Sequence, residues 1–494
     1  MFYTEKLPNN NKSSLKVKLS DFSKGINTRV SENILPLNYA VNTFNYSYSS
    51  GALKEGLGLK VLEMPDLLGE SRQISAPTGV TKIINAWPFK RYDNAGQRFS
   101  PYLMIYCDDK KLYYWRVATF EDLYQDTGLT FDTEPAGVNY RLNGTDSFLC
   151  CAPNVIGVYS TATCKLYSEN VPSITSVALH AGRLFATTGG DQSQLWFSDD
   201  LNPTSWNVSA FDGGYIELTD ERGALKKVVE SNNYLYIIRE FGITRVSGWG
   251  LQSDFNVKNM YLSTGKIYHN TAVLCGKIIV MMCRDGLYYF DGNDMTKLQL
   301  GLDKYFENVD NSNAVGAFLN GKYYVACKFN YNDNRTIGCE KTNFINNTLL
   351  EFDINTGELN ILRGVDISRL TAFQVGDYSK LIVCSNGEKS NILSEITHDG
   401  KVYGVATQKI WDSPYTDMGY PTYKKVLKTM YIDTKNDIIL EINANGKIHT
   451  FIGKGSDSTI RIPINIITNK FSITIKATTE ACEISNPVLE VALC

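Results

Sequence analysis

The sequence predicts an all-β protein whose main part is a β-propeller. Aromatic residues make up 12% of the 494 residues, led by 30 Tyr and 22 Phe, and aromatic residues favour strands over helices. Apolar and polar residues alternate with a period of two in short segments such as 102–107, 183–187 and 470–476. No long amphipathic helical pattern with capping residues interrupts these segments.

Turn dipeptides separate many of the predicted strands. Asn-Gly and Asp-Gly tolerate the positive φ angles of tight hairpin turns. Each such dipeptide therefore predicts an antiparallel hairpin. They occur at 285–286, 291–292, 320–321, 386–387, 399–400 and 445–446.

One motif recurs seven times, an apolar strand followed by a polar turn and a second, mostly aromatic, strand. Its anchor residues on the apolar strands are Ile105, Leu149, Phe185, Tyr236, Val280, Val325 and Ile382. Their mean spacing is about 46 residues, close to the ~40–50 residues of a four-stranded propeller blade. We predict six to eight blades, with seven as the best count. A pair of β-sandwiches would also give regularly spaced hairpins and is the alternative.

The two flanks of this repeat differ from it. Residues 1–63 are irregular and predict an extended N-terminal arm, followed by the propeller over 64–411. Longer alternating strands fill residues 412–494 and predict a small C-terminal β-sandwich. Pro414 and Pro421 mark the boundary between the propeller and the sandwich.

Composition excludes several classes of protein. The 49 Lys and Arg nearly balance the 52 Asp and Glu, for a net charge of −3, which argues against a protein that coats DNA. The longest apolar run, 278–283, is far shorter than the ~20 residues of a membrane-spanning helix. The eleven cysteines include no Cys-x-x-Cys pair, which predicts reduced thiols folded in a reducing cytosol. Six of them are expected to be buried, namely Cys107, Cys150, Cys151, Cys283, Cys327 and Cys384.

The common catalytic and nucleotide-binding motifs are missing from the sequence. It contains no G-x-x-x-x-G-K-[ST], no H-E-x-x-H and no G-x-S-x-G. The four histidines, His180, His269, His398 and His449, are too far apart in sequence to form a local metal or proton-transfer cluster. We therefore predict that the protein is not an enzyme, with no catalytic, cofactor-binding or metal-binding residues.

Four local patterns favour structural roles over chemistry. Residues 198–206 resemble the Asp-box turn of sialidase-type propellers, although Asn202 replaces the usual Gly. Residues 330–334 alternate oxygen-bearing side chains as calcium loops do, but Arg335 replaces the sharp-turn Gly. We therefore interpret 330–347 as a long exposed insertion in one blade. The cluster Lys424, Lys425 and Lys428 predicts a solvated face. The adjacent carboxylates Asp108, Asp109, Asp199 and Asp200 predict solvated turns, where a glycosidase would need two carboxylates across a pocket.

Three phrases near the N-terminus carry a family likeness. They read Asp21-Phe-Ser-Lys-Gly-Ile-Asn-Thr-Arg29, Leu35-Pro-Leu-Asn-Tyr-Ala-Val-Asn42 and Gly51-Ala-Leu-Lys-Glu-Gly56. This order resembles the opening of many tailed-bacteriophage virion proteins, where it precedes a β-propeller. The propeller phrases 180–185, 195–206 and 284–292 are similar to those of the same group. One departure is Lys54-Glu55, which stands where Arg or Pro commonly precedes the glycine.

The resemblance implies a structural function. Proteins of this group include the tail nozzle, or tail tubular, proteins of short-tailed phages, which form rings around the DNA channel. It implies a homo-oligomer, six copies in the usual arrangement, in contact with other tail and portal-adaptor proteins. Double-stranded DNA would pass through without sequence-specific binding, during genome retention and ejection. The expected location is the virion tail, assembled in the bacterial host cytoplasm.

Candidate contacts between subunits follow from the N-terminal arm and the insertion at 330–347. They are Phe22, Asn27, Arg29, Tyr331, Asn332 and Arg335. Two alternatives remain beside the tail ring. The first is a receptor- or carbohydrate-binding propeller at the tail tip, and the second is a glycoside-acting enzyme.

Overall fold

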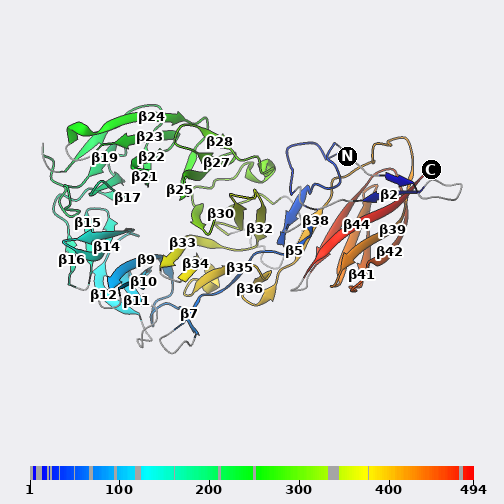
Figure 1. Cartoon of the computed structure of the whole chain (residues 1–494), viewed down its shortest axis with the longest axis horizontal. Coiled ribbons are helices and arrows are strands. Elements are labelled where there is room, and N and C mark those ends of the chain that lie inside the picture. The colour runs from blue at the N-terminus through cyan, green and yellow to red at the C-terminus, as the bar shows by residue number, and fades with distance from the viewer. Residues whose placement is uncertain are drawn as a thin grey trace.

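The computed structural model describes most of the chain as two β-rich bodies placed along one axis (Figure 1). The described residues exclude 1–3, 7–13, 19–21, 23–24, 33, 49–50, 66–70, 94–96, 117–123, 161, 210–212, 249–251, 332–343, 376–377 and 478–481. A ring of blades lies at one end of the molecule and a pair of packed sheets at the other. In the described part of the chain, no helix is long and apolar enough to cross a membrane.

The ring is a propeller of seven blades, each with four antiparallel strands. Blades one to three comprise β9 (Ile83–Asp93), β10 (Arg98–Cys107), β11 (Lys111–Arg116), β12 (Gln125–Thr130), β13 (Ala136–Leu142), β14 (Thr145–Ala152), β15 (Val155–Tyr159), β16 (Cys164–Tyr167), β17 (Ile174–His180), β18 (Arg183–Thr188), β19 (Gln194–Phe197) and β20 (Gly214–Glu217). Blades four to six comprise β21 (Leu225–Ser231), β22 (Tyr234–Arg239), β23 (Gly242–Ser247), β24 (Asn256–Leu262), β25 (Ile267–Cys275), β26 (Ile278–Cys283), β27 (Gly286–Phe290), β28 (Met295–Lys297), β29 (Val315–Leu319), β30 (Lys322–Cys327), β31 (Thr348–Asp353) and β32 (Leu359–Arg363). Short 3-10 turns η2 (Gln252–Asp254), η3 (Asp303–Phe306) and η4 (Gly387–Lys389) lie in connections.

Blade seven combines two distant parts of the chain. Its first three strands are β33 (Ile367–Val375), β34 (Tyr378–Ser385) and β35 (Leu393–Thr397). The fourth is β6 (Gly58–Val61), which comes from the N-terminal segment and pairs antiparallel with β35. The short strands β36 (Lys401–Val402) and β37 (Val405–Ala406) extend this sheet beyond β6. Because the innermost strand β33 packs beside β9 of blade one, the ring is closed.

The propeller prediction and its best blade count are confirmed. The seven anchors of the sequence repeat lie on the second strand of the seven blades, from Ile105 on β10 to Ile382 on β34. The second strand is the most deeply buried position of a blade, which is why it carries the strongest apolar signal. The six cysteines expected to be buried are also buried free thiols.

One hairpin prediction is wrong, and the reason is the N-terminal strand. The dipeptide Asp399-Gly400 follows β35, but β35 and β36 do not pair with each other. Strand β6 lies between them and takes the edge of β35. A local turn signal could not reveal a strand inserted from residues 58–61.

The second body is a sandwich of two five-stranded sheets. One sheet has the order β1 (Thr4–Lys6), β2 (Ser14–Lys18), β44 (Ile484–Leu493), β39 (Lys425–Thr434) and β42 (Ile460–Thr468). The other has the order β3 (Asn42–Phe44), β38 (Lys409–Asp412), β43 (Phe471–Ala477), β40 (Ile438–Ala444) and β41 (Lys447–Gly453). Alternate residues of β42 are buried between the sheets, and its remaining residues face outward. The predicted C-terminal sandwich is present, and strands from residues 4–44 complete both of its sheets.

The remaining strands of the N-terminal segment form small ribbons. Strand β4 (Tyr46–Ser47) pairs with β5 (Lys54–Glu55), and β7 (Glu63–Pro65) pairs with β8 (Ser71–Gln73). The range predicted as an arm thus supplies strands to the propeller and to the sandwich, and its described residues are largely packed against both.

The buried carboxylate of Glu351 in blade six predicts a pH dependence of stability. The Glu351 carboxylate accepts hydrogen bonds from Lys322 Nζ at 3.0 Å, from His398 Nε2 at 2.8 Å and from Asn360 Nδ2 at 2.8 Å. Burial alone would raise its pKa, but His398, Asn360 and Lys322 together lower the pKa of Glu351 to about 2. The folded-state pKa therefore lies below the unfolded value near 4.5.

The stabilisation by this cluster should be complete above pH 4.5 and disappear as the pH falls toward 2. We expect its loss to lower the free energy of unfolding by about 2–3 kcal/mol. Urea unfolding at pH 7 and pH 3 measures it, and E351Q should show a shallower pH dependence than the wild type. The exposed D132N provides the control. An E351Q protein with the wild-type pH profile would contradict the prediction.

Candidate functional site

A cavity of about 810 Å³ lies at the centre of the propeller. The innermost strands of all seven blades line it, namely β9, β13, β17, β21, β25, β29 and β33, together with the residues just before β13. Its polar lining side chains come mostly from the beginnings of these strands. The volume falls within the ~300–1,000 Å³ of ligand pockets. The cavity is the main candidate site for a small molecule.

A repeated β-bulge supplies polar side chains to this cavity. The register shifts between residues 83 and 85, 174 and 176, 225 and 227, and 367 and 369. Each bulge follows an apolar residue and precedes a polar one, because an extra residue re-aims the next side chain. The four polar residues, Asn85, Ser176, Lys227 and Arg369, all line the cavity.

One side of the cavity is positively charged. Lys226 Nζ donates to Gln192 Oε1 at 2.6 Å, and Lys227 Nζ donates to the Ala272 carbonyl at 2.9 Å. Burial lowers the pKa of Lys227 to about 8. Burial, followed by the charges of Lys227, Lys226 and Lys266, lowers the pKa of His269 to about 4. At neutral pH the Lys227 amine is therefore mostly protonated, and the His269 imidazole is neutral.

The opposite side of the cavity holds a neutralised pair. Arg369 Nε donates to Glu134 Oε1 at 2.8 Å, and Arg369 Nη2 donates to Glu134 Oε2 at 2.5 Å. Asn85 Nδ2 donates to the same carboxylate at 2.7 Å. The paired carboxylate is thus occupied by its own neighbours, and the cavity keeps the charge of Lys226 and Lys227.

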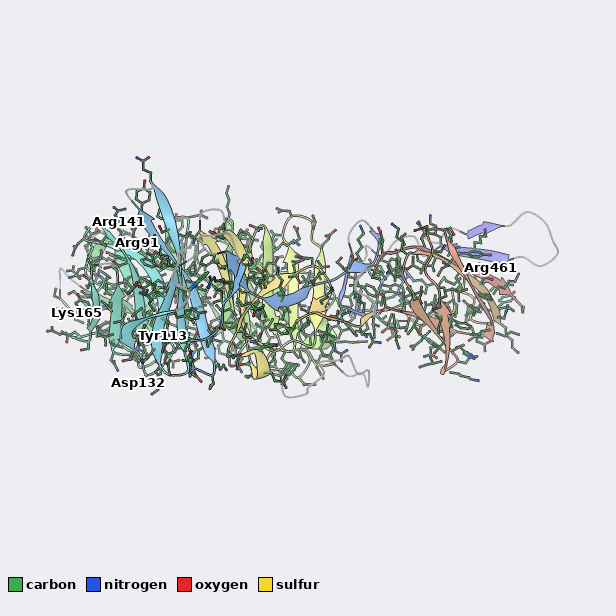
Figure 2. The ribbon with its side chains drawn as sticks, turned by 90° about the horizontal axis from the view of Figure 1, so that it is seen from below. Arg91, Tyr113, Asp132, Arg141, Lys165 and Arg461 are labelled. Carbon is green, nitrogen blue, oxygen red and sulfur yellow. The ribbon has the colours of Figure 1, made fainter. Side chains whose placement is uncertain are left out.

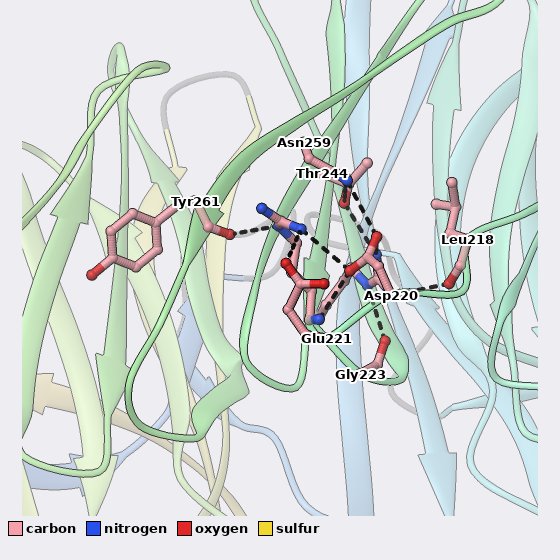
Figure 3. Close-up of polar contacts among 9 residues, drawn as sticks. Leu218, Asp220, Glu221, Gly223, Thr244, Asn259 and Tyr261 are labelled. Atoms are coloured by element: carbon pink, nitrogen blue, oxygen red, sulfur yellow. Dashed lines mark hydrogen bonds and ion pairs between the residues drawn. The ribbon is translucent and has the colours of Figure 1, made fainter.

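A polar cluster beside the cavity fixes the start of β21 (Figure 3). The buried Arg239 donates from Nε to the Gly223 carbonyl at 2.9 Å and from Nη2 to the Leu218 carbonyl at 2.9 Å. Its Nη1 donates to Asp220 at 2.8 Å, and Arg222 also contacts this carboxylate. Burial alone would raise the pKa of Asp220. The hydrogen bond from the Arg222 backbone and the two guanidinium groups outweigh it, so that the pKa of Asp220 lies below its ordinary value. This cluster holds the turn at 218–223, which leads directly into Lys226 and Lys227.

Replacing Lys227 by methionine should stabilise the protein. The folded-state pKa of about 8 lies below the ordinary 10.5, so the folded state disfavours the charged amine at all pH values below 8. Removing the charge should raise the free energy of unfolding at pH 7 by about 1 kcal/mol, after the lost hydrogen bond to Ala272 is counted. Urea unfolding at pH 7 and pH 10.5 measures this, and the gain should vanish at the higher pH. K258M, on the exposed face of β24, is the control. A destabilised K227M would refute it.

Four of the predicted subunit-contact residues lie at the junction between the propeller and the sandwich. Phe22 is only 1% exposed, and its ring packs edge-on against Trp411 at 5.0 Å. Asn27 Oδ1 accepts the Arg29 backbone N–H at 3.1 Å, and Arg29 Nε pairs with Asp303 at 2.5 Å. These contacts are within one chain. For Phe22 this is a correction, since its buried ring leaves no surface for a second subunit.

The fourth of these residues, Tyr331, packs at the same junction. The Arg363 guanidinium lies 3.7 Å from the centre of its ring and 4.8 Å from that of Phe44. The Tyr331 hydroxyl is 2.7 Å from Thr348 Oγ1. Asn332 and Arg335 lie outside the described residues, as does most of the insertion predicted at 330–347.

The glycine that closes the N-terminal motif has a steric role. A Cβ on Gly56 would lie 2.3 Å from the Asn45 carbonyl oxygen. Asn45 in turn accepts the Arg363 N–H on its Oδ1 at 2.8 Å and donates from Nδ2 to the Gln408 carbonyl at 2.8 Å. The Asn45 side chain thus joins blade six to the start of the sandwich. Gly56 is required beside it because any larger residue would collide with the Asn45 backbone.

Exposed apolar side chains occur toward both ends of the molecule. We define the sandwich patch as Ile448, Ile452 and Ile467, which are 62%, 66% and 64% exposed on the edge strands β41 and β42. We define the blade-three patch as Leu201 and Val208, 70% and 63% exposed after β19. Strands β41 and β19 lie at opposite ends of the long axis in Figure 1.

A view along the plane of the propeller shows the same two ends of the molecule (Figure 2). Arg461 of β42 marks the sandwich end, and Lys165 of β16 marks the far end of the propeller. Arg91 and Arg141 lie toward one face of the disc, and Asp132 lies toward the other. The molecule is therefore elongated, with distinct surfaces at its two ends.

The Asp-box-like segment is a structural turn, as the sequence indicated. Asn202 Oδ1 accepts the Thr204 hydroxyl at 2.9 Å, and the buried Trp206 donates from Nε1 to the Pro203 carbonyl at 3.0 Å.

The lysine cluster at 424–428 differs from the prediction of a solvated face. Lys425 is fully buried. Its Nζ donates to the carbonyls of Tyr420, Tyr423 and Asn469, and these hydrogen bonds satisfy the buried ammonium group. Within the described residues, no group of three or more His, Cys, Asp or Glu side chains could hold a metal ion.

Comparisons with known proteins give likenesses of fold alone. No protein-family model and no curated protein matches the chain. A solved structure of BBS1N in complex with ARL6DN, soaked with lead, is 12% identical, with 66% of this chain and 96% of that chain covered and a TM-score of 0.43. A chain of a mitotic checkpoint complex is 7% identical, with 69% and 94% covered and a TM-score of 0.39. The propeller assignment itself rests on the strand order and the closed ring of blades.

Proposed function

We propose that this chain is a structural subunit of a bacteriophage tail, similar to the nozzle proteins that surround the DNA channel. In this function several copies form a ring, six in the usual arrangement, that contributes to genome retention and ejection. The resemblance of residues 21–56 to tailed-phage virion proteins motivates the phage assignment. The observation that supports assembly is the placement of the sandwich patch and the blade-three patch at opposite ends of the molecule.

Patches at opposite ends suit a head-to-tail contact between identical subunits. In such a heterologous contact one surface of each copy meets a different surface of the next, and the series closes into a ring if the rotation between copies allows. Burying exposed isoleucine, leucine and valine side chains supplies the driving force, at about 25 cal/mol per Å² of apolar surface. The edge strands β41 and β42 also offer backbone groups for pairing.

Charge substitutions in each patch test this arrangement. I467K should disrupt the sandwich end, and L201K should disrupt the blade-three end. Each variant alone should be monomeric by light scattering after size exclusion, while the wild type forms closed rings visible by electron microscopy. A mixture of the two variants retains one intact interface and should form a dimer and nothing larger.

The control is V405K, which alters an exposed apolar residue of β37 outside both patches. Its assembly should equal that of the wild type. A wild type that stays monomeric at high concentration, also in the presence of purified tail and portal-adaptor proteins, would refute the proposed function. Variants I467K and L201K that still form rings would refute the assignment of the two patches.

A truncation separates folding of the propeller from assembly. Deleting residues 1–20 removes β1 and β2, so that β44 becomes an edge strand of the sandwich. Strand β6 remains, and the propeller should stay closed. We expect weakened ring formation with retained propeller folding, measured by light scattering and near-UV circular dichroism. Rings of wild-type stability after this deletion would contradict a contribution of the N-terminal residues.

A further inference from the structure

Two lysines of the central cavity form no ion pair among the described residues. We propose that it binds a small hydroxylated organic anion, whose carboxylate or phosphate group lies between Lys226, Lys227 and His269. This site is distinct from the two end patches, and the proposal does not depend on the proposed assembly.

The arrangement of charges carries the proposal. Lys226 and Lys227 both line the cavity, and their ammonium groups donate to an amide oxygen and a backbone carbonyl. Among the described residues, the partners of both ammonium groups are neutral oxygens, and neither lysine forms an ion pair. The Glu134 carboxylate is already held by Arg369 and Asn85. Two adjacent half-buried cations without a carboxylate are costly unless an anion accompanies them.

His269 lies in a positively charged environment, and burial together with this environment lowers the pKa of its imidazole. All of the charges that act on its imidazole are those of lysines, namely Lys227, Lys226 and Lys266. An anion between these groups would lower the repulsion among them and would favour protonation of the imidazole. Such a ligand would gain charge-assisted hydrogen bonds, which are about twice as strong as neutral ones.

The remaining lining indicates a hydroxylated ligand of moderate size. Asn270 and Gln192 contribute amide groups to the lining of the same cavity, and Thr371 contributes a hydroxyl oxygen that can still accept a hydrogen bond. Trp87 and Phe318 add two aromatic residues to the lining. Amides and hydroxyls that converge with a charged group fix the orientation of a polar ligand. The volume of about 810 Å³ accommodates a sugar acid or a sugar phosphate.

The bulge geometry shows that the site is built by the fold. Lys227 occupies the same bulge position on β21 as Asn85 on β9, Ser176 on β17 and Arg369 on β33. The Arg239 cluster holds the turn that precedes Lys226 and Lys227. The backbone that carries Lys226 and Lys227 is therefore fixed by the fold, and each ammonium group is held by one hydrogen bond.

Isothermal titration of the full chain at low ionic strength and pH 7 tests the proposal. The probes are glucuronate, glucose 6-phosphate and glucose. Glucuronate or glucose 6-phosphate should bind with a dissociation constant of 1 mM or tighter, on the order expected for a single charged contact with several hydrogen bonds. Binding of glucuronate alone would identify a carboxylate ligand, and binding of glucose 6-phosphate alone would identify a phosphate ligand. Glucose should bind at least tenfold more weakly than either.

Variants assign the binding to this cavity. K226M and K227M should each weaken anion binding at least tenfold, while K258M on the outermost strand β24 should leave it unchanged. Because K227M is expected to be at least as stable as the wild type, loss of binding with retained thermal unfolding cannot be due to misfolding. Failure of both anions to bind the wild type, or equal affinity of the wild type and K227M, would overturn the proposal. Inorganic phosphate binding as tightly as glucose 6-phosphate would overturn the role of the hydroxyl groups.

Discussion

Replacing Trp411 by alanine is expected to lower the free energy of unfolding by about 3–5 kcal/mol. Trp411 is fully buried on β38, the strand that follows the propeller and enters the sandwich. Its ring packs against Phe22 and joins the apolar core between the two sheets. The substitution leaves a cavity at the point where the N-terminal segment, the end of the propeller and the sandwich meet. The loss combines the transfer free energy of the indole with the cost of that cavity.

Chemical unfolding followed by fluorescence and circular dichroism measures this effect. The matched variant is W411F, which keeps an aromatic ring opposite Phe22. It also removes the indole N–H, which is buried with no hydrogen-bond partner among the described residues. W411F should therefore cost much less than W411A. The exposed Y423A is the control and should stay within about 0.5 kcal/mol of the wild type. A loss below about 1 kcal/mol for W411A would show that the junction is not a tightly packed core.

Replacing Arg239 by methionine is the second large effect, about 3–5 kcal/mol of destabilisation. Methionine preserves much of the side-chain volume but donates none of the hydrogen bonds. It leaves the carbonyls of Leu218 and Gly223 unpaired and Asp220 without its closest cation. Arg222 stays beside Asp220, with a longer separation of 3.3 Å. The turn at 218–223 should loosen, and with it the first residues of β21.

A double-mutant cycle with D220N measures how much of the loss comes from the uncompensated charge of Asp220. R239M with D220N should lose less stability than the sum of the single losses, since asparagine removes the uncompensated charge. R141M provides the control, because Arg141 is exposed and its ion pair with Asp146 is long, at 3.9 Å. Hydrogen exchange should show faster opening of the amides of β21 in R239M. Additive losses in the cycle would contradict the ion-pair explanation.

The sequence was sufficient to predict the propeller because its signal is local and repeated. Each blade places an apolar second strand before a polar turn, so Ile105, Leu149 and their five counterparts recur at blade spacing. The N-terminal strands could not be predicted in the same way. Strand β6 pairs with β35, and β2 pairs with β44, across more than 300 residues. Short strands of three to five residues carry little periodicity, and their pairing leaves no mark in adjacent residues.

The cavity was not predicted, although the sequence contains a signal for it. The beginnings of four innermost strands read Ile83-x-Asn85, Ile174-x-Ser176, Leu225-x-Lys227 and Ile367-x-Arg369. Aligned by blade, this apolar, variable, polar pattern marks the bulge that turns a polar side chain inward. The N-terminal arm predicts Phe22 as a subunit contact, but its ring is buried within one chain. A buried aromatic that joins two parts of one chain has the same sequence signature as one that joins two chains.

The closing strand of blade seven also sets the timing of folding during synthesis. Strand β6 leaves the ribosome early, and its partner β35 follows only after six blades have been made. At roughly 5–20 residues per second this delay is on the order of tens of seconds. For that period Leu57 and Leu59, which are buried in the finished protein, lack the β35 surface that covers them. Strand β2 waits longer still, for β44. A nascent chain that ends before β44 lacks the central strand between β2 and β39, so the sandwich can be completed only after translation through β44.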